Sequence, residues 1–355
     1  MTIPRDSRIY VAGHRGLVGS AIIECLQEKG YTSLITADKS VLDLCNQHAV
    51  LSFFAYTKPE YVILAAAKVG GILANATYPA EFIHDNLSIA LNVIHASHTH
   101  GVKKLINLGS SCIYPKFAEQ PIKESALLTG PLEPTNEAYA LAKIAAIGLC
   151  TSYHKQYGSN FLSLMPTNLY GSKDNYHLMH SHVIPAIIRK CFLAKYLAEN
   201  NLAALRADLA IGIPDHWDIS TDQNMMECLN SIGIRQNELT LWGTGKARRE
   251  FLHASDCASA VVYALNHIEA HEQEQCLNIG TGIDNEIGEI AHIIAQLVGF
   301  EGTIHFDSGK PDGTPRKVLN VDAIHSKGWN HSINLEDGLK LTIEEYRLKG
   351  PEYAR

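Results

Sequence analysis

The chain has 355 residues, of which 46% are hydrophobic and 19% are charged, so it can bury one large core or two smaller ones. Its formal net charge of -7 at pH 7 argues against non-specific binding to nucleic acid, which needs a basic face. The eight cysteines form no CxxC pair, and no apolar run is long enough to cross a bilayer. We therefore expect a cytoplasmic protein with reduced thiols, no metal site and no membrane partner.

The first two-thirds of the chain alternate between strand-like and helix-like segments. Short apolar runs begin at Arg8, Ser33, Tyr61, Lys104 and Phe161. Helix-like stretches separate these runs at 17–29, 46–57, 79–100 and 137–157. Apolar strands that alternate with helices predict a parallel sheet covered on both faces. Right-handed crossovers then make a doubly wound α/β sheet of the Rossmann type the expected topology.

The alternation weakens after about residue 178. Residues 182–200 look helical, 201–237 look irregular, and two further strand–helix units are expected at 238–268 and 276–299. The last part, 304–346, combines a short strand, a loop at 309–317 and a final helix. We therefore expect a Rossmann domain of residues 1–178 plus about 250–282. A smaller α+β substrate-binding cap would comprise residues 179–249 plus 283–355.

A glycine-rich turn joins the first predicted strand to the first predicted helix. It contains the seven residues Gly13, His14, Arg15, Gly16, Leu17, Val18 and Gly19. The first glycine permits a tight turn, the second lets the backbone approach a pyrophosphate, and the third lets the helix pack against the strand. The N–H groups at the start of the helix then bind the anion. This GxxGxxG spacing predicts a dinucleotide site and is typical of short-chain dehydrogenases.

The end of the second predicted strand bears on the choice of coenzyme. Asp38 favours the free 2′-hydroxyl of NAD, whereas Lys39 favours the 2′-phosphate of NADP. Arg15 in the glycine turn is a second possible ligand of that phosphate, so we favour NADP(H). In the alternative interpretation, Lys39 is only a solvated surface lysine.

A serine, a tyrosine and a lysine form the predicted centre of reduction. Tyr139 and Lys143 lie four residues apart, on one face of the helix expected at 137–157. A lysine cation beside a phenol lowers the phenol pKa from its usual value of about 10. Tyr139 can then protonate a carbonyl oxygen as hydride reaches the carbon. Ser110 follows the strand that ends at Leu108, and strand ends of a parallel sheet face the ligand crevice.

Longer blocks of sequence carry a resemblance to a known family. They are Ala12-Gly-His-Arg-Gly, Ala65-Ala-Ala-Lys-Val-Gly-Gly-Ile, Leu108-Gly-Ser-Ser-Cys-Ile-Tyr-Pro, Leu132-Glu-Pro-Thr-Asn-Glu, Met165-Pro-Thr-Asn-Leu-Tyr-Gly, Ser181-His-Val-Ile-Pro-Ala, Arg249-Glu-Phe-Leu-His and Lys310-Pro-Asp-Gly-Thr-Pro-Arg-Lys. With these blocks the chain resembles the GDP-L-fucose synthase family of extended short-chain dehydrogenases. The resemblance covers nearly the whole chain except about residues 195–237.

This resemblance implies three chemical steps at one site. GDP-4-keto-6-deoxy-D-mannose is epimerised at C3 and C5, and NADPH then reduces C4 to give GDP-L-fucose. A ketone at C4 acidifies the protons on both neighbouring carbons, so one site that stabilises an enolate can serve both epimerisations. By resemblance, Cys112 and His182 remove and return these protons. Ser110, Tyr139 and Lys143 carry out the reduction and hold the enolate oxygen.

The resemblance also implies binding residues and a homodimer that packs the helix of Tyr139. The residues implied for the coenzyme, besides the glycine turn and Lys39, are Leu108, Gly109, Ser110, Ser111, Lys143, Pro166, Thr167, Asn168, Leu169 and His182. Those implied for the GDP-keto-sugar are Lys190, Trp242, Arg249 and Asp312. Lys190 replaces an arginine of the family pattern, which keeps the charge and loses bidentate geometry. Residues 195–237 look like an insertion of about forty residues, of the length that forms a lid, an interface or a functional loop.

Two other functions fit parts of this pattern. A GDP-L-colitose synthase would perform the same chemistry on a 3-deoxy substrate and would need only the C5 epimerisation. A catalytically inactive, NADP-sensing protein could use the same fold, because a fold alone does not fix a function. That second alternative predicts damage to the serine, tyrosine and lysine set, and the set is intact in this sequence.

Overall fold

The computed structural model describes residues 2–273, 275–310, 312–352 and 354 of the chain. The chain divides into two compact units. The first comprises Met1–Leu169, Glu250–Gly282 and Val318–Ile333, and the second Tyr170–Arg249, Ile283–Lys317 and Asn334–Arg355. Within the described ranges, we find no helix with the length and apolar character needed to span a membrane.

The first unit is built on a parallel sheet of six strands in the order β10-β5-β4-β3-β1-β2. Ala12 pairs with Leu64, and Leu108 pairs with Leu164, so neighbouring strands end at the same edge of the sheet. This is the predicted doubly wound topology, which is confirmed. The strands are β1 (Ile9–Ala12), β2 (Leu34–Ile35), β3 (Tyr61–Leu64), β4 (Lys104–Leu108), β5 (Phe161–Pro166) and β10 (Leu277–Ile279).

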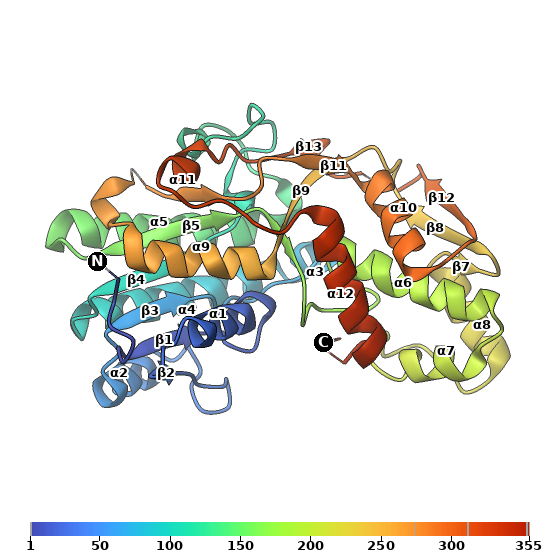
Figure 1. Ribbon diagram of the computed structural model, residues 1–355, viewed down its shortest axis with the longest axis horizontal. Coiled ribbons are helices and arrows are strands. Elements are labelled where there is room, and N and C mark those ends of the chain that lie inside the picture. The colour runs from blue at the N-terminus through green and yellow to red at the C-terminus, as the bar shows by residue number, and fades with distance from the viewer. Residues whose placement is uncertain (1, 274, 311, 353, 355) are drawn as a thin grey trace. The chain divides into compact units, whose positions relative to one another are not determined.

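Helices cover both faces of this sheet (Figure 1). Side chains alternate along β1, because successive residues of a strand point to opposite faces. Ile9 and Val11 pack in a core with α1 and α9, whereas Tyr10 and Ala12 pack in a second core with α2, α4 and α5. The helices of the first unit are α1 (Leu17–Glu28), α2 (Gln47–Thr57), α3 (Ile72–Thr77), α4 (Pro79–Thr99), α5 (Glu137–Tyr157), α9 (Ala254–His267) and α11 (Asp322–Ser326). Short 3-10 helices are η1 (Ser111–Ile113), η2 (Glu124–Ala126), η3 (Pro134–Asn136) and η4 (Ala270–Glu272).

The strand order reverses at β1. The chain adds β2 on one side of β1 and then places β3 on the other side. In open α/β sheets, ligands bind outside the carboxyl ends of the strands at such a switch point. The carboxyl ends of β1 and β3 therefore mark the expected coenzyme site.

The second unit combines helices with short strands. Strand β8 (Glu238–Trp242) pairs in parallel with β12 (Thr303–Asp307) and antiparallel with β7 (Ile234–Arg235). Helix α6 (Val183–Ala198) packs against α7 (Leu202–Leu209) and α10 (Ile287–Val298), and α10 also contacts α12 (Leu335–Lys349). The second unit also contains α8 (Asp222–Ser231), β11 (Asp284–Glu286) and β13 (Arg316–Lys317). Strands β6 (Asn168–Tyr170) and β9 (Arg248–His253) contribute residues to both units.

Three expectations about the cap need correction. Residues 201–237 are irregular only in part, because they form α7, α8 and β7, with no helix or strand at 210–221. The expected strand–helix unit at 276–299 is divided, with β10 in the first unit and α10 in the second. Residues 318–333, expected in the cap, belong to the first unit. The backbone N–H of Leu319 donates to the Glu250 carboxylate (2.8 Å) and that of Ser332 to Asp256 (3.0 Å), so buried carboxylates hold this segment.

Candidate active site

The glycine turn after β1 packs against the chain that follows β3. Gly13 has a positive φ of 86°, and a Cβ atom there would lie 2.7 Å from Cα of Ala66. A Cβ atom on Gly19 would lie 2.1 Å from the carbonyl oxygen of Gly13. At Gly16, by contrast, a Cβ atom would make only an ordinary contact of 3.5 Å. The fold itself thus requires glycine at positions 13 and 19, whereas position 16 has room for a Cβ atom.

The start of α1 fits an anionic group. Gly16 is the N-cap residue of α1, and no side chain caps the helix. The first backbone N–H groups of a helix lack partners within the helix and carry partial positive charge. Gly16 is exposed, so a diphosphate could reach these groups. The residues of this turn therefore fit the pyrophosphate of a dinucleotide.

Asp38 is paired with two residues of the glycine turn. The guanidinium of Arg15 lies 2.7 Å from one oxygen of the Asp38 carboxylate, and Nε2 of His14 lies 3.3 Å from the other. Lys39 is exposed beside this pair. The positive charge of Arg15 compensates the negative charge of Asp38. Lys39 then gives this region a net positive charge, which favours a 2′-phosphate over a free hydroxyl.

The loop after β4 places Ser110 and Cys112. Gly109 donates its backbone N–H to the carbonyl of Leu164 on β5 (2.9 Å), and Ser110 is the N-cap residue of η1. The hydroxyl oxygen of Ser110 accepts a hydrogen bond from the backbone N–H of Cys112 (3.4 Å). Ser110 is half-buried and Cys112 is buried. The short 3-10 helix thus brings both predicted residues together at the carboxyl edge of the sheet.

Helix α5 adds the tyrosine and the lysine to the same edge. Lys143 donates from Nζ to the carbonyl oxygen of Leu108 (2.8 Å), and this nitrogen lies 5.7 Å from the ring centre of Tyr139. The ring of Phe82 meets the ring of Tyr139 edge-on, with ring centres 6.4 Å apart. The first unit therefore brings together four predicted residues, namely Ser110, Cys112, Tyr139 and Lys143.

The electrostatics of this pair differ from our expectation. Burial raises the pKa of Tyr139, and the nearby Cys112 thiol raises it further. Burial also lowers the pKa of Lys143 to about 8. Our expectation that Lys143 lowers the phenol pKa is therefore wrong for this structure, because loss of hydration dominates for both groups. Tyr139 is protonated at neutral pH, which is the form that donates a proton.

A buried glutamate missed by the sequence analysis holds the stretch Pro166–Leu169. The backbone carbonyl of Glu250 accepts hydrogen bonds from the side chains of Thr167 (3.3 Å) and Asn168 (2.9 Å). Its carboxylate accepts the backbone N–H groups of Thr281 (2.6 Å), Gly282 (2.8 Å) and Leu319 (2.8 Å). The available signal was an acidic residue inside a strand, between two arginines and the apolar pair Phe251 and Leu252.

The second unit contains the other predicted residues. His182 is the N-cap residue of α6, and its side chain is exposed. Lys190 lies further along α6 and donates to the carbonyl of Ile232 (2.9 Å). Burial lowers the pKa of Lys190 to about 8. Its ammonium group is therefore held by the backbone just before β7, and not by the residues implied for the sugar nucleotide.

Trp242, Arg249 and Asp312 form a cluster within the second unit. Thr244 donates its backbone N–H (2.6 Å) and its hydroxyl (2.8 Å) to the Asp312 carboxylate. These hydrogen bonds, with a smaller contribution from the Arg249 charge, lower the pKa of Asp312. The ring of Trp242 is 60% exposed, and the Lys310 ammonium lies 5.4 Å from its centre. Thr244 and Lys310 were not predicted, and Pro311 of the same block lies outside the described residues.

A glycine turn at the switch point, with serine, tyrosine and lysine at the next strand end, defines a dinucleotide-dependent oxidoreductase or epimerase. The family described as NAD dependent epimerase/dehydratase matches residues 9–207 and 219–280. The chain belongs to this family.

GDP-L-fucose synthase 1 of Arabidopsis thaliana is 48% identical over 342 residues, which span 96% of this chain and 94% of that protein. GDP-L-fucose synthase of Escherichia coli strain K12 is 46% identical over 345 residues, or 95% of both chains. The resemblance found in the sequence is thus confirmed.

Two further relatives bear on the substrate. A GDP-mannoheptose C4 reductase from Campylobacter jejuni, solved with NADP bound, is 40% identical with a TM-score of 0.87, and the match covers 97% of this chain and 99% of that one. GDP-L-colitose synthase of Yersinia pseudotuberculosis is 32% identical over 340 residues, or 96% of this chain and 97% of that protein. The colitose enzyme is therefore a more distant relative than the fucose synthases of Arabidopsis thaliana and Escherichia coli.

Proposed function

We propose that this chain converts GDP-4-keto-6-deoxy-D-mannose to GDP-L-fucose by epimerisation at C3 and C5 followed by reduction at C4. The observation that carries the proposal is the cluster at the carboxyl edge of the first unit. There Ser110 and Cys112 share one loop, and Lys143 links the helix of Tyr139 to the carbonyl of Leu108. The identity of 46–48% with GDP-L-fucose synthases supports the choice of substrate.

The coenzyme of the proposed reaction is NADP(H). The glycine turn would hold the pyrophosphate, and Arg15 and Lys39 would face the 2′-phosphate. The loop Leu108–Ser111 and the stretch Pro166–Leu169, which is tied to Glu250, would line the rest of the coenzyme. When bound, NADPH supplies the hydride that reaches C4.

The reduction needs a proton donor at the C4 oxygen. Tyr139 is protonated at neutral pH and donates its hydroxyl proton to this oxygen, while the Ser110 hydroxyl donates a hydrogen bond to it. Lys143, fixed to the carbonyl of Leu108, places its positive charge near the phenolate that forms. The lysine thus stabilises the product state of the proton transfer.

The epimerisations need groups that remove and return protons on the carbons beside the ketone. We assign these roles to Cys112 in the first unit and His182 in the second. Ser110 and Tyr139 hold the enolate oxygen that forms at C4 during each exchange. The same hydrogen-bond donors therefore stabilise the enolate and later protonate the alkoxide.

The GDP part of the substrate fits the cluster in the second unit. The exposed ring of Trp242 offers a face for a purine base. Arg249 and Lys310 supply positive charge for the diphosphate, and Asp312, ionised and fixed by Thr244, accepts hydrogen bonds from hydroxyl groups. Lys190 donates to the carbonyl of Ile232, which leaves donors of its ammonium group for a ligand.

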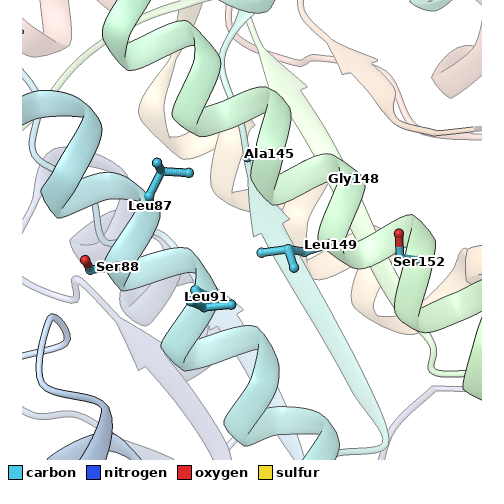
Figure 2. Close-up of a pocket in the computed structure, with 7 residues that line it drawn as sticks. All are labelled: Leu87, Ser88, Leu91, Ala145, Gly148, Leu149 and Ser152. Carbon is cyan, nitrogen blue, oxygen red and sulfur yellow. The ribbon is translucent and has the colours of Figure 1, made fainter.

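A homodimer completes the proposal. Helices α4 and α5 leave an open apolar groove lined by Leu87, Leu91 and Leu149, with small residues on α5 at Ala145 and Gly148 (Figure 2). Leu91 is 48% exposed, and a Cβ atom on Gly148 would meet no atom within 4 Å. Such a face lets helices of a second copy approach closely. Sedimentation at several protein concentrations, with Leu91→Arg as the disrupting variant, tests this assignment.

A second candidate substrate has specific support. The GDP-mannoheptose C4 reductase matches this chain over nearly the whole of both chains with a TM-score of 0.87. The reducing cluster of the first unit would serve a GDP-linked 4-keto-heptose equally well, because the reacting ketone is the same. The residues of the cap would then have to accept the longer sugar.

The proposed function is tested by supplying the purified protein with NADPH and, separately, three GDP-linked 4-keto-sugars. These are the 6-deoxy-mannose compound, its 3-deoxy analogue and a heptose compound. We expect the highest kcat/KM with the first and the formation of GDP-L-fucose. Turnover of the 3-deoxy sugar alone would indicate a colitose synthase, and turnover of the heptose alone would indicate a heptose reductase. NADH in place of NADPH tests the coenzyme.

A further inference from the structure

The family match is interrupted in the part of the cap that we expected to be inserted. The match ends at residue 207 and resumes at residue 219, within the stretch 195–237. In the structure, this interruption begins at the end of α7. Three of its residues, Asp208, Ile211 and Gly212, provide acceptors for one buried arginine of α6.

Arg189 is completely buried and uses all five of its N–H donors. Nε donates to the Asp208 carboxylate (2.9 Å), and Nη2 donates to the carbonyls of Asp208 (2.9 Å) and Ile211 (2.6 Å). Nη1 donates to the carbonyls of Gly212 (2.9 Å) and Tyr176 (2.7 Å). The guanidinium thus joins the interruption to the segment that precedes α6.

The Asp208 carboxylate is equally well satisfied. One oxygen accepts from Arg189, and the other accepts from the hydroxyl of Tyr346 on α12 (2.5 Å). Asp208 is buried with only 6% of its surface exposed. A buried ion pair persists only when its geometry is good and its other hydrogen bonds are made. The pair therefore fixes residue 208 relative to both α6 and α12.

A second link joins Gly212 directly to the same segment. The backbone N–H of Leu178 donates to the carbonyl of Gly212 (3.1 Å). Gly212 has a positive φ of 62°, and a Cβ atom there would lie 2.1 Å from the Ala354 Cβ and 3.1 Å from Nη1 of Arg189. Glycine is therefore required for this approach. Leu178 lies four residues before His182, the N-cap residue of α6.

Side chains support this segment at some points: the Tyr176 ring packs against the Tyr346 ring, and Nδ1 of His177 accepts the backbone N–H of Met179 (3.1 Å). Oδ2 of Asp174 and the hydroxyl of Tyr176 are buried and have no hydrogen-bond partner in the described part of the chain. Burial raises the pKa of Asp174 to about 7. The backbone of the segment is bound as well, at Tyr176 by Arg189 and at Leu178 by Gly212.

We propose that Arg189 and residues 208–212 form a clamp that fixes the segment 176–182 and thereby orients His182. Arg189 is a positioning residue in this clamp, and the interruption of the family match supplies its acceptors. The orientation of His182 matters because this residue exchanges protons with the substrate, so this part of the inference rests on the proposed function. The clamp itself rests only on the hydrogen bonds described above.

The test uses two variants that loosen the clamp in different ways. Arg189→Met removes the five donors, and Gly212→Ala presses a methyl group against Ala354 and Arg189 without burying a new charge. Arg206→Gln is the matched control, because Arg206 lies on α7 beside the clamp residue Asp208 but pairs with Asp222 at the surface. Circular dichroism and the midpoint of thermal unfolding establish that each variant is folded.

The first measurement is hydrogen–deuterium exchange of backbone amides in the full-length protein. We expect amides in peptides that cover 171–182 to exchange about tenfold faster in Arg189→Met and Gly212→Ala, and as in the wild type in Arg206→Gln, because local opening controls protection. Wild-type exchange in both clamp variants would overturn the clamp. This measurement does not depend on any activity.

The second measurement compares two reactions of the same variants. One reaction is the incorporation of solvent deuterium into the substrate, and the other is NADPH oxidation with an already epimerised keto-sugar. We expect the rate of the first to fall about tenfold more than the rate of the second, because only the deuterium exchange needs His182 in place. Equal loss of deuterium incorporation and NADPH oxidation would contradict the proposal that the clamp orients His182. Faster amide exchange with no change in the ratio of these two reaction rates would also contradict it. If the wild type turns over no 4-keto-sugar, the proposed function fails, and the amide exchange alone decides whether the clamp exists.

Discussion

The two units hold their candidate site residues by different means. In the first unit, the residues are tied to backbone groups at the edge of the sheet. Cys112 donates its N–H to Ser110, and Lys143 donates to the carbonyl of Leu108. In the second unit, His182 and Lys190 belong to α6, whereas Trp242 and Asp312 lie at a strand end and on a loop, where Asp312 is held by Thr244 and Trp242 is exposed.

The residues assigned to the reduction therefore lie in the first unit, and those assigned to binding of the sugar nucleotide lie in the second. The geometry of the reducing groups follows from β4, η1 and α5, and packing on both faces of the sheet fixes these elements. Side chains on surface loops can change with little effect on the core. We therefore expect changes in the first unit to affect the chemical steps. Changes in the second unit, apart from those at His182 and at the clamp that orients it, should affect the recognition of the sugar nucleotide.

The largest effect should come from Tyr139→Phe. Removal of the proton donor should lower the rate of C4 reduction by about 10²–10⁴-fold, which is the range for loss of a general acid. Deuterium exchange at C3 and C5 should continue in part, because Ser110 still donates to the enolate oxygen. Stopped-flow measurement of NADPH oxidation, and mass spectrometry of the substrate in heavy water, report the two reactions. Tyr157→Phe, an exposed change on the same helix, should match the wild type.

Cys112→Ser should have the opposite pattern. A serine hydroxyl is a much weaker base than a thiolate, so deuterium exchange should fall by about 10²-fold. Binding of NADPH should be unchanged, and an already epimerised keto-sugar should still be reduced. Cys228→Ser, in helix α8 of the cap, is the control. If both Cys112→Ser and Tyr139→Phe lost the two reactions equally, the division of roles within the first unit would be contradicted.

The sheet of the first unit could be predicted because its signals are local. Apolar runs and a glycine turn define β1 and α1, and the predicted starts at Arg8 and Tyr61 agree closely with β1 and β3. Ser110, Tyr139 and Lys143 were found because strand ends of a parallel sheet meet at one edge.

The contacts of the cap could not be predicted in this way. Arg189 binds the carbonyls of Asp208, Ile211 and Gly212, which lie 19–23 positions further along the chain. Such bonds depend on tertiary packing and leave no periodic pattern. The raised pKa of Tyr139 was missed for a similar reason, because hydration is lost through the fold as a whole.

In the second unit, Arg249→Lys should weaken binding of the sugar nucleotide. Loss of one charge-assisted hydrogen bond should raise its KM by about 10–100-fold, with little change in the KM of NADPH. Arg248→Lys is the matched control, because Arg248 is paired with Asp284 (3.1 Å) and Glu286 (3.3 Å). Arg248→Lys should change the free energy of unfolding only slightly, because surface ion pairs contribute little, and it should leave both KM values unchanged. Steady-state kinetics with each substrate varied in turn give both KM values. A larger rise in the KM of the sugar nucleotide in Arg248→Lys than in Arg249→Lys would contradict this assignment.

The pH dependence should report on Lys143 in the first unit. Its pKa, lowered by burial to about 8, means that the ammonium loses its proton as the pH rises through that value. The reduction rate should then fall by about tenfold for each pH unit above this pKa, because the phenolate of Tyr139 loses its cationic neighbour. Arg stays charged in this range, so Lys143→Arg should be slower throughout but should lose the alkaline decline. A decline at the same pH in Lys143→Arg would assign it to another group.

The smallest predicted effect concerns the glycine turn, where Gly19 is required by the fold and Gly16 is not. Gly16→Ala places its methyl group 3.5 Å from the Gly13 carbonyl, so the fold should tolerate it, and the methyl group would meet only the coenzyme. We expect the KM of NADPH to rise by about fivefold without a change in the thermal midpoint, since less than one hydrogen bond to a charged group is lost. Gly19→Ala places its methyl group 2.1 Å from that same oxygen, so it should lower the free energy of unfolding by about 1–3 kcal/mol. Titration with NADPH and thermal unfolding of both variants decide the matter. A loss of stability in Gly16→Ala equal to that in Gly19→Ala would mean that the turn requires all three glycines for folding, and the space at Gly16 would no longer indicate a coenzyme.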